Sequence, residues 1–136
     1  ASETAIFGVF CRRWGVPLID GGTVLLPRIV GQGRALDMIL TGRPVEAAEA
    51  LAMGLANRVV PSGEALAAAT RLAHEIARFP ALCMKTDRLS AYRQFDFDLE
   101  EALRFEGRGG EAPLKAEARA GAERFKGGEG RGGAFD

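Results

Sequence analysis

The sequence predicts the second half of a larger α/β domain, and three observations support this fold class. Its 136 residues are enough for one domain with a buried core. Five or six segments have helical apolar spacing, whereas only two short segments have the composition of strands. One of these, Ile-Phe-Gly-Val-Phe, is apolar on both faces and needs strands on both sides, which an isolated pair of strands does not provide. We therefore expect further strands of the sheet to lie outside these residues.

The first part of the chain alternates between short elements and glycine or proline breaks. A buried strand is expected over residues 6–11 and a loop over residues 16–22, with Pro17 and a glycine pair as breakers. Helices are expected over residues 23–30 and 33–40. Gly42 follows at the position of a C-terminal helix cap.

Pro44 is expected to start a short alanine-rich helix that Gly54 closes, and residues 55–61 are predicted as the second short strand. From there the chain is predicted to be helical, first over residues 64–78 and then through a helix marked by Leu82, Leu89 and Tyr92.

Asp98 and Glu101 form a capping-box pattern for another helix, and residues 107–110 are expected to interrupt it. A last helix is expected to start at Pro113, with an apolar stripe of Leu114, Ala118, Ala122 and Phe125. Residues 127–133 are too rich in glycine for a regular element.

Composition excludes several classes of function. Apolar residues make up 47% of the chain, but no run approaches the roughly 18 residues that a membrane span needs. The 18 basic and 18 acidic side chains balance, which argues against nucleic acid or a membrane surface as a partner.

The chain has a single histidine, which argues against a zinc site with two histidine ligands. No secretory leader is recognised, and Cys11 and Cys83 lie far apart in sequence, so a reduced, cytoplasmic protein is expected.

The stretch LTGRPVEAAEALAMGLANRVVP, residues 40–61, resembles the second half of the crotonase superfamily, the enoyl-CoA hydratases and isomerases. The Gly-Gly-Thr of residues 21–23, the Leu-Pro that follows it and the Val-Gly pair of residues 30–31 are similar too. The resemblance is close over residues 1–60 and looser to residue 95. In the tail it depends on helix pattern and on the ending from Gly128 to Phe135.

This resemblance implies an α/β crotonase-like fold, a spiral of ββα units, of which only the mostly helical C-terminal half is present. Residues 1–61 would belong to the core, residues 62–126 to a helical trimerisation region and residues 127–136 to a flexible glycine-rich tail. The substrates implied are acyl-CoA thioesters, with no bound cofactor and no metal. In the family, two backbone N–H groups that stabilise the thioester oxyanion, and one of two catalytic glutamates, lie in the other half of the chain.

By position after Phe7-Gly8, the second glutamate of typical hydratases falls on Cys11. A neutral thiol in an apolar strand cannot perform that acid/base role at pH 7. Cys11 as a nucleophile would need a neighbouring base, and buried packing is the favoured interpretation.

Asp20 is the candidate substitute carboxylate, because related enzymes with other chemistries place an aspartate in this loop. The alternative is an N-cap role, in which the Asp20 carboxylate accepts from the amides of Gly22 or Thr23. The two roles are compatible, and the N-cap is favoured.

The resemblance also predicts a substrate-binding wall. Its residues are Phe10, Trp14, Ile19, Gly21 and Gly22. Core packing explains Phe10 and Trp14 equally well. Arg12 and Arg13 could approach the phosphates of coenzyme A, although a solvated face is favoured for both.

We therefore expect an acyl-CoA-acting lyase or isomerase of the enoyl-CoA hydratase type in the intact protein, with these residues inactive alone. The implied partners are the acyl-CoA substrate, the missing N-terminal half of the fold and further copies in a trimer or hexamer. Two alternatives stay open: a non-catalytic truncated oligomerisation or binding module, and a one-carboxylate enoyl-CoA isomerase.

Overall fold

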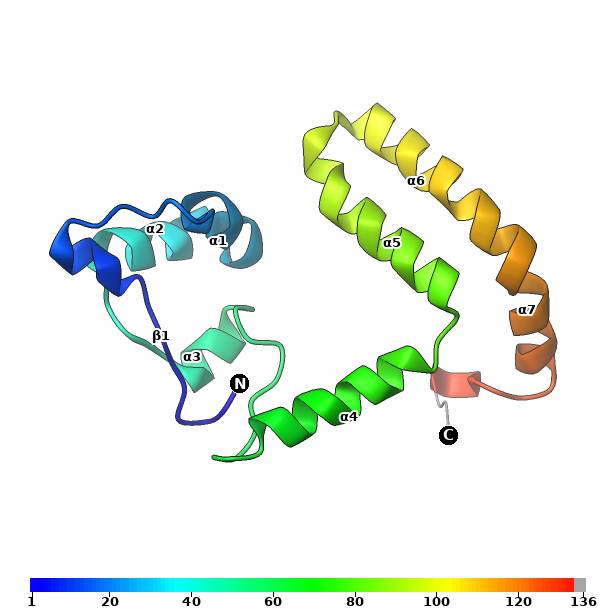
Figure 1. Ribbon diagram of the computed structural model, residues 1–136, viewed down its shortest axis with the longest axis horizontal. Helices are drawn as coiled ribbons and strands as arrows, with labels where there is room; N and C mark the ends of the chain where they lie inside the picture. Colours follow the sequence, from blue (N-terminus) through cyan, green and yellow to red (C-terminus); the bar gives the residue numbers. More distant parts are fainter. Residues whose placement is uncertain (134–136) are drawn as a thin grey trace. The chain divides into compact units, whose positions relative to one another are not determined.

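The computed structural model describes residues 1–133 of the chain, as a succession of helices with very little sheet (Figure 1). The chain divides into two compact units. The first unit is Ala1–Leu72 and the second begins at Ala73, so that the boundary falls inside helix α4 (Ala65–Ala77).

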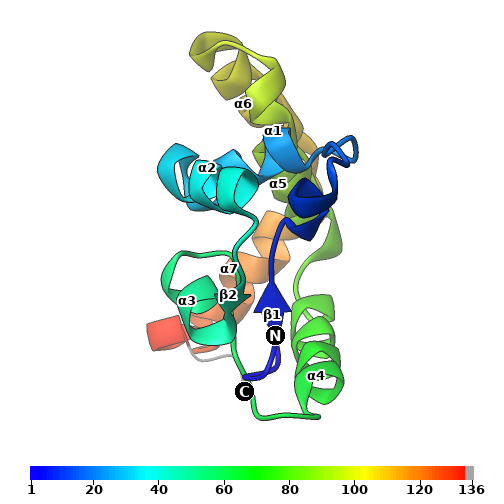
Figure 2. The same cartoon turned by 90° about the vertical axis from the view of Figure 1, so that its left-hand side faces the viewer.

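The first unit contains the sheet, which consists of two short antiparallel strands (Figure 2). Strand β1 (Ile6–Phe7) pairs with β2 (Val45–Glu46), with Ile6 opposite Glu46 and Phe7 opposite Val45. A single parallel bridge joins Ser2 to Val60. This ladder is too short to be stable by itself, so the helices that pack beside it must contribute most of the stability of the unit.

Three further helices, one 3-10 turn and the first part of α4 complete the first unit. The 3-10 turn η1 (Phe10–Trp14) follows β1, and α1 (Gly22–Val30), α2 (Gln32–Thr41) and α3 (Ala47–Ala52) follow in order. The predicted C-terminal cap of α2 is confirmed: Gly42 has φ 59°, and its amide donates to the Met38 carbonyl oxygen at 3.0 Å.

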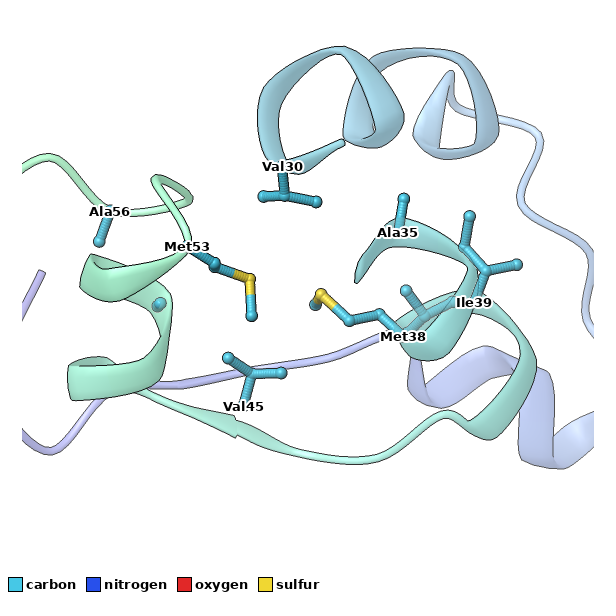
Figure 3. Packing of buried hydrophobic residues seen from close by; sticks show 9 residues of the cluster. Val30, Ala35, Met38, Ile39, Val45, Met53 and Ala56 are labelled. Carbon is cyan, nitrogen blue, oxygen red and sulfur yellow. The ribbon is translucent and has the colours of Figure 1, made fainter. Parts of the chain in front are cut away.

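The core of the first unit lies between α1, α2, α3 and β2. Met38 of α2 and Met53, just after α3, point toward one another between Val30 and Val45 (Figure 3). Val45 is fully buried, and Ala35 reaches the same degree of burial. Because methionine is unbranched and flexible, the pair fills the space between helices whose other buried side chains are mainly alanine.

The second unit is built on an antiparallel pair of helices, α5 (Ala81–Arg93) and α6 (Leu99–Pro113), joined by a 3-10 turn η2 (Gln94–Asp96) (Figure 1). The predicted cap of α6 is confirmed, because Asp98 Oδ1 accepts from the Glu101 amide at 2.8 Å. The chain then continues through a π turn η3 (Leu114–Ala118) and helix α7 (Arg119–Lys126) to a 3-10 turn η4 (Arg131–Gly133).

The predicted interruption at residues 107–110 is wrong, because α6 runs through it, and the predicted helix start at Pro113 is wrong, because α6 already contains that residue. A Cβ atom added to Gly109 would lie 3.0 Å from Thr86 Cγ2, so this glycine lets α5 and α6 approach closely. Pro113 is the last residue of α6, and the chain leaves it through a π turn, a form of helix that absorbs local irregularity.

The predictions for the strands are also wrong in extent. Only residues 6 and 7 of the expected strand over residues 6–11 are extended, and Ile6 is 62% exposed. Residues 55–61 form one bridge instead of a strand, and Pro44 precedes β2 instead of starting a helix. An apolar run becomes a strand only where a neighbour supplies hydrogen bonds, and β2 is so short that it pairs with two residues only. The end of the predicted tail, residues 134–136, lies outside the described residues.

Within residues 1–133, none of the helices combines the length and the apolar character that crossing a bilayer requires.

Candidate functional site

Three predicted site residues lie on one turn of 3-10 helix, η1, with sequence Phe-Cys-Arg-Arg-Trp. Gly15 closes the turn in the left-handed region at φ 71°, and its amide donates to the Arg12 carbonyl oxygen at 3.3 Å. The Val16 amide donates to the Cys11 carbonyl oxygen at 3.2 Å. Cys11 therefore sits on a helical turn, and the expectation that it belongs to a buried strand is wrong.

Cys11 is half-buried and its thiol is free, with the side chain packed against the core cluster of the first unit. This placement agrees with the packing interpretation of the residue. Cys83 is free and exposed, and the nearby Asp87 carboxylate raises the pKa of its thiol above the ordinary value of 9.0. Negative charge beside Cys83 therefore disfavours the thiolate, which is the nucleophilic form.

The predicted wall residues are largely accessible in this chain. Phe10 is 41% exposed, Trp14 is 80% exposed and Ile19 is 81% exposed. The Phe10 ring lies directly against Gly8, where an added Cβ atom would be 2.4 Å from the ring carbons. Trp14 therefore does not pack into the core of the described residues, and all three side chains present apolar atoms to solvent.

Asp20, Gly21 and Gly22 lie at the start of α1, but the capping interpretation of Asp20 is wrong. The N-cap is Gly21, at φ 86°, and none of the described side chains caps this helix. The Gly21 carbonyl oxygen accepts from the amides of Val24 and Leu25 at 3.0 and 2.8 Å. Because the glycine occupies the cap position, Asp20 is one residue too early to reach the first amides of the helix. Its exposed carboxylate is therefore available to another group.

Two contacts of η1 were not predicted from the sequence. The Nε–H of Arg12 donates to the Ile39 carbonyl oxygen at 3.1 Å, near the end of α2. At Gly42 an added Cβ atom would lie 3.2 Å from the Val9 carbonyl oxygen and 3.6 Å from Arg12 Cβ. Arg12 and Arg13 directly follow the predicted strand over residues 6–11, and nothing in the local sequence indicated such a contact.

A groove of about 1470 Å³ in the second unit contains none of the predicted site residues. Its lining includes Glu75, Phe79, Gly121, Arg124 and Phe125. Its charged residues are of both signs, so its composition does not point to a particular ligand.

The comparisons with known proteins agree with one another. Residues 1–129 match the family described as enoyl-CoA hydratase/isomerase. A protein of Rhizobium meliloti named probable enoyl-CoA hydratase is 44% identical over 110 residues, which are 79% of this chain and 42% of the relative. A probable mitochondrial enoyl-CoA hydratase of Dictyostelium discoideum is 35% identical over 108 residues, which are 79% of this chain and 39% of the relative.

Solved structures give the same result for the fold. The crystal structure of an enoyl-CoA hydratase from Bacillus anthracis superposes with a TM-score of 0.85 at 30% identity, over 92% of this chain and 49% of that one. An enoyl-CoA hydratase structure from Geobacillus kaustophilus gives a TM-score of 0.85 at 31% identity, over 91% of this chain and 48% of that one. The chain thus has the crotonase fold over about half the length of the structures that it matches.

Proposed function

Since the chain belongs to the enoyl-CoA hydratase/isomerase family, we propose that it forms one side of an acyl-CoA site in a longer protein that hydrates 2-enoyl-CoA thioesters. The observation that carries this proposal is the match of residues 1–129 to that family, together with the 44% identity over 110 residues to a relative named probable enoyl-CoA hydratase. The chain spans 42% of the first of these relatives, so the activity belongs to the whole protein.

The proposed chemistry is the addition of water across the double bond next to the thioester. The water oxygen adds to C3, which becomes the carbon that carries the hydroxyl group. Negative charge then develops on the thioester oxygen, until C2 takes up a proton. Backbone N–H groups of the other half of the fold would stabilise that oxygen. Asp20 would act as a general acid or base, because its carboxylate is exposed and does not cap α1.

The exposed apolar side chains of Phe10, Trp14 and Ile19 support an acyl-binding role for this segment. Substrate pockets are lined mainly by apolar and aromatic side chains with a few polar groups. Gly21 and Gly22 would let the start of α1 approach the thioester, since neither carries a side chain there.

A chimera tests this proposal. This chain would replace the matched C-terminal part of the Rhizobium meliloti relative, and hydration of crotonyl-CoA would be followed by the loss of enoyl absorbance. We expect the chimera to be active and this chain alone to be inactive. Asp20→Asn in the chimera should lower kcat by about 10²–10⁴-fold, the usual contribution of a general acid or base.

Thr23→Val is the control, because it alters the same helix start without changing a carboxylate, and it should keep most of the activity. Hydration by this chain alone would contradict the proposal. An active chimera whose Asp20→Asn variant matches its parent would remove Asp20 from the mechanism.

Cys11 distinguishes hydration from the one-carboxylate isomerase alternative. If the family's second glutamate is needed for hydration, Cys11→Glu in the chimera should raise the hydration rate. If the protein is an isomerase, the parent chimera would instead convert 3-enoyl-CoA to 2-enoyl-CoA and would not hydrate the 2-enoyl-CoA that it forms. Cys11→Glu would not accelerate that conversion.

The alternative of a non-catalytic binding or oligomerisation module is favoured by one observation. The α5–α6 pair leaves Leu89, Tyr92, Leu99 and Leu103 more than half exposed. A trimer or hexamer of this chain in sedimentation, together with an inactive but folded chimera, would support the module. A monomer would exclude oligomerisation through these helices.

A further inference from the structure

Arg12 differs from its neighbour Arg13 in what its guanidinium contacts. Arg12 donates through Nε to the Ile39 carbonyl oxygen at 3.1 Å, a bond that is partly buried. Arg13 instead lies over the Phe10 ring, at 5.8 Å from its centroid. The Arg12 guanidinium therefore joins η1 to another element, whereas the Arg13 guanidinium lies over a ring of the same turn.

The acceptor of this bond is a carbonyl group that α2 cannot satisfy. Helix α2 ends at Thr41, so the Ile39 carbonyl is among the last four, which have no partner in the helix. The Met38 carbonyl is satisfied by the Gly42 amide at 3.0 Å. A guanidinium is well suited to the Ile39 carbonyl, because it donates a hydrogen bond and its positive charge at a helix C-terminus is favoured by the helix dipole.

Gly42 brings the two backbones together at the same place. It lies in the left-handed region at φ 59°, and an added Cβ atom would meet the Val9 carbonyl oxygen at 3.2 Å. The segment that leads into η1 therefore rests directly on the turn that ends α2. The glycine allows this contact, and Arg12 supplies its hydrogen bond.

The turn η1 needs such support because a single 3-10 turn has poor hydrogen-bond geometry. It carries Phe10 and Trp14, which project apolar surface, and Cys11, which packs against the core. We propose that Arg12 is a positioning residue: through the Ile39 carbonyl it holds η1 in place as one wall of the acyl-CoA site. The inference deepens the proposed function and rests on it for the identity of the ligand, whereas the positioning itself rests on the contacts above.

Accessibility of the Cys11 thiol measures this positioning in the chain as it stands. Because Cys11 is half-buried, the rate at which iodoacetamide labels it, read by peptide mass spectrometry, depends on how firmly η1 is held. Arg12→Met should speed the labelling of Cys11 by about tenfold, the change expected when a hydrogen bond from a charged group is lost. Arg12→Lys keeps a donor and should recover much of the protection.

Arg13→Met is the matched control, because it removes the same charge one residue away and should leave Cys11 labelling unchanged. Cys83 serves as the reference for the reagent in every variant. Hydrogen exchange completes the test: in Arg12→Met, amides of residues 10–16 should exchange faster while those of α3 keep their protection.

Two results would overturn the proposal. Unchanged Cys11 labelling in Arg12→Met would show that the contact does not hold the turn. Equal loss of protection in α3 would show that Arg12 supports the whole unit and not the turn in particular.

Kinetics of the chimera connect the positioning to the reaction. Arg12→Met should lower kcat more than it raises KM, whereas loss of a phosphate ligand would mainly raise KM. A rise in KM alone would therefore overturn the positioning role. An inactive parent chimera would refute the proposed function, but the labelling and exchange results would still decide whether Arg12 holds η1.

Discussion

At the scale of single residues, Arg43 makes the densest set of polar contacts in the first unit. Its Nε–H donates to Asp37 Oδ2 at 2.6 Å, and its two terminal nitrogens donate to the Glu49 carboxylate at 2.9 and 2.5 Å. Asp37 lies on α2 and Glu49 on α3, so this one side chain links the helices on either side of β2. The Arg43 hydrogen bonds hold the pKa of Glu49 below its ordinary value of 4.5.

Arg43→Met should therefore lower the melting temperature of the first unit by about 3–5 °C. A bidentate ion pair that also reaches a second carboxylate stabilises a fold more than an isolated surface pair does. The effect should depend on pH. A carboxyl group with a lowered pKa stabilises the fold at pH values above 4.5 and loses that contribution as the pH falls through its folded value.

The difference between wild type and Arg43→Met should thus be constant near neutral pH and shrink below pH 4.5 in thermal melts followed by circular dichroism. Lys115→Met, at an exposed pair 3.8 Å from Glu111, is the control and should change little. A difference that grows as the pH falls would contradict this account.

Gly42 is a second residue whose replacement has a definite cost. Gly42→Ala places a side chain at φ 59° and 3.2 Å from the Val9 carbonyl oxygen, so it should destabilise the first unit by about 1–2 kcal/mol in urea unfolding. Gly33→Ala is the matched control in the same helix, because nothing lies within 4 Å of its added Cβ atom. Its stability should be equal to wild type or higher; a loss equal to that of Gly42→Ala would contradict the steric explanation.

At this scale the sequence predicted residue types better than their partners. The cap at Gly42 and the Asp98 cap followed from local patterns, since both act within a few residues. Asp20 was assigned to the helix start because aspartate is a common cap, but Gly21 takes that position. The bond from Arg12 to Ile39 spans 27 residues, and a sequence pattern has no information about such a contact.

At the scale of elements, the start of α5 depends on a residue from the π turn η3. The Glu117 carboxylate accepts from the amides of Leu82 and Cys83 at 3.1 and 2.9 Å. Pro80 precedes α5 and offers no capping side chain. An acceptor on one element therefore caps the helix of another, in the place where a local Ser or Asp would ordinarily act.

Glu117→Ala should destabilise the second unit by about 1–2 kcal/mol, as expected for a lost N-cap, and fray the first turn of α5. Urea unfolding and hydrogen exchange at residues 81–84 would measure the two effects. Glu123→Ala is the control, because its partner Arg119 is on the same helix and both are largely exposed. Faster exchange along all of α5, without preference for its first turn, would contradict a capping role.

The positions of helices were predicted better than their ends. Apolar spacing located α1, α2 and α4 because each has an amphipathic pattern, and α5 packs along α6 although its own pattern is weak. The glycines at residues 107–110 and Pro113 predicted helix breaks that α6 does not have, because the effect of these residues on a helix depends on what packs against them. Gly109 is tolerated because it faces Thr86, a contact between two helices that local sequence does not reveal.

At the scale of the whole molecule, large apolar side chains remain accessible in both units. Trp14, Ile19, Leu66 and Leu99 are each more than three-quarters exposed. Exposed apolar surface binds hydrophobic dyes. We expect this chain to enhance the fluorescence of anilinonaphthalene sulfonate at neutral pH and the folded chimera to enhance it much less. Equal enhancement by both would show that the added half leaves these surfaces open.

The fold class of the whole molecule could be predicted because it depends on proportions: many helical patterns, two short strand patterns and one diagnostic motif. The lengths of the strands could not, because a strand is defined by its neighbour as much as by its own residues. Ile-Phe-Gly-Val-Phe has the composition of a central strand, yet only Ile6 and Phe7 find a partner.

The exposure of Trp14 has one practical result. It is the only tryptophan of the chain, so the intrinsic fluorescence excited at its absorption edge reports one place, the end of η1. Its indole is in contact with solvent and should emit at long wavelength. A blue shift of that emission would report, without any added label, that another polypeptide or an acyl chain has bound over this turn and removed the indole from water.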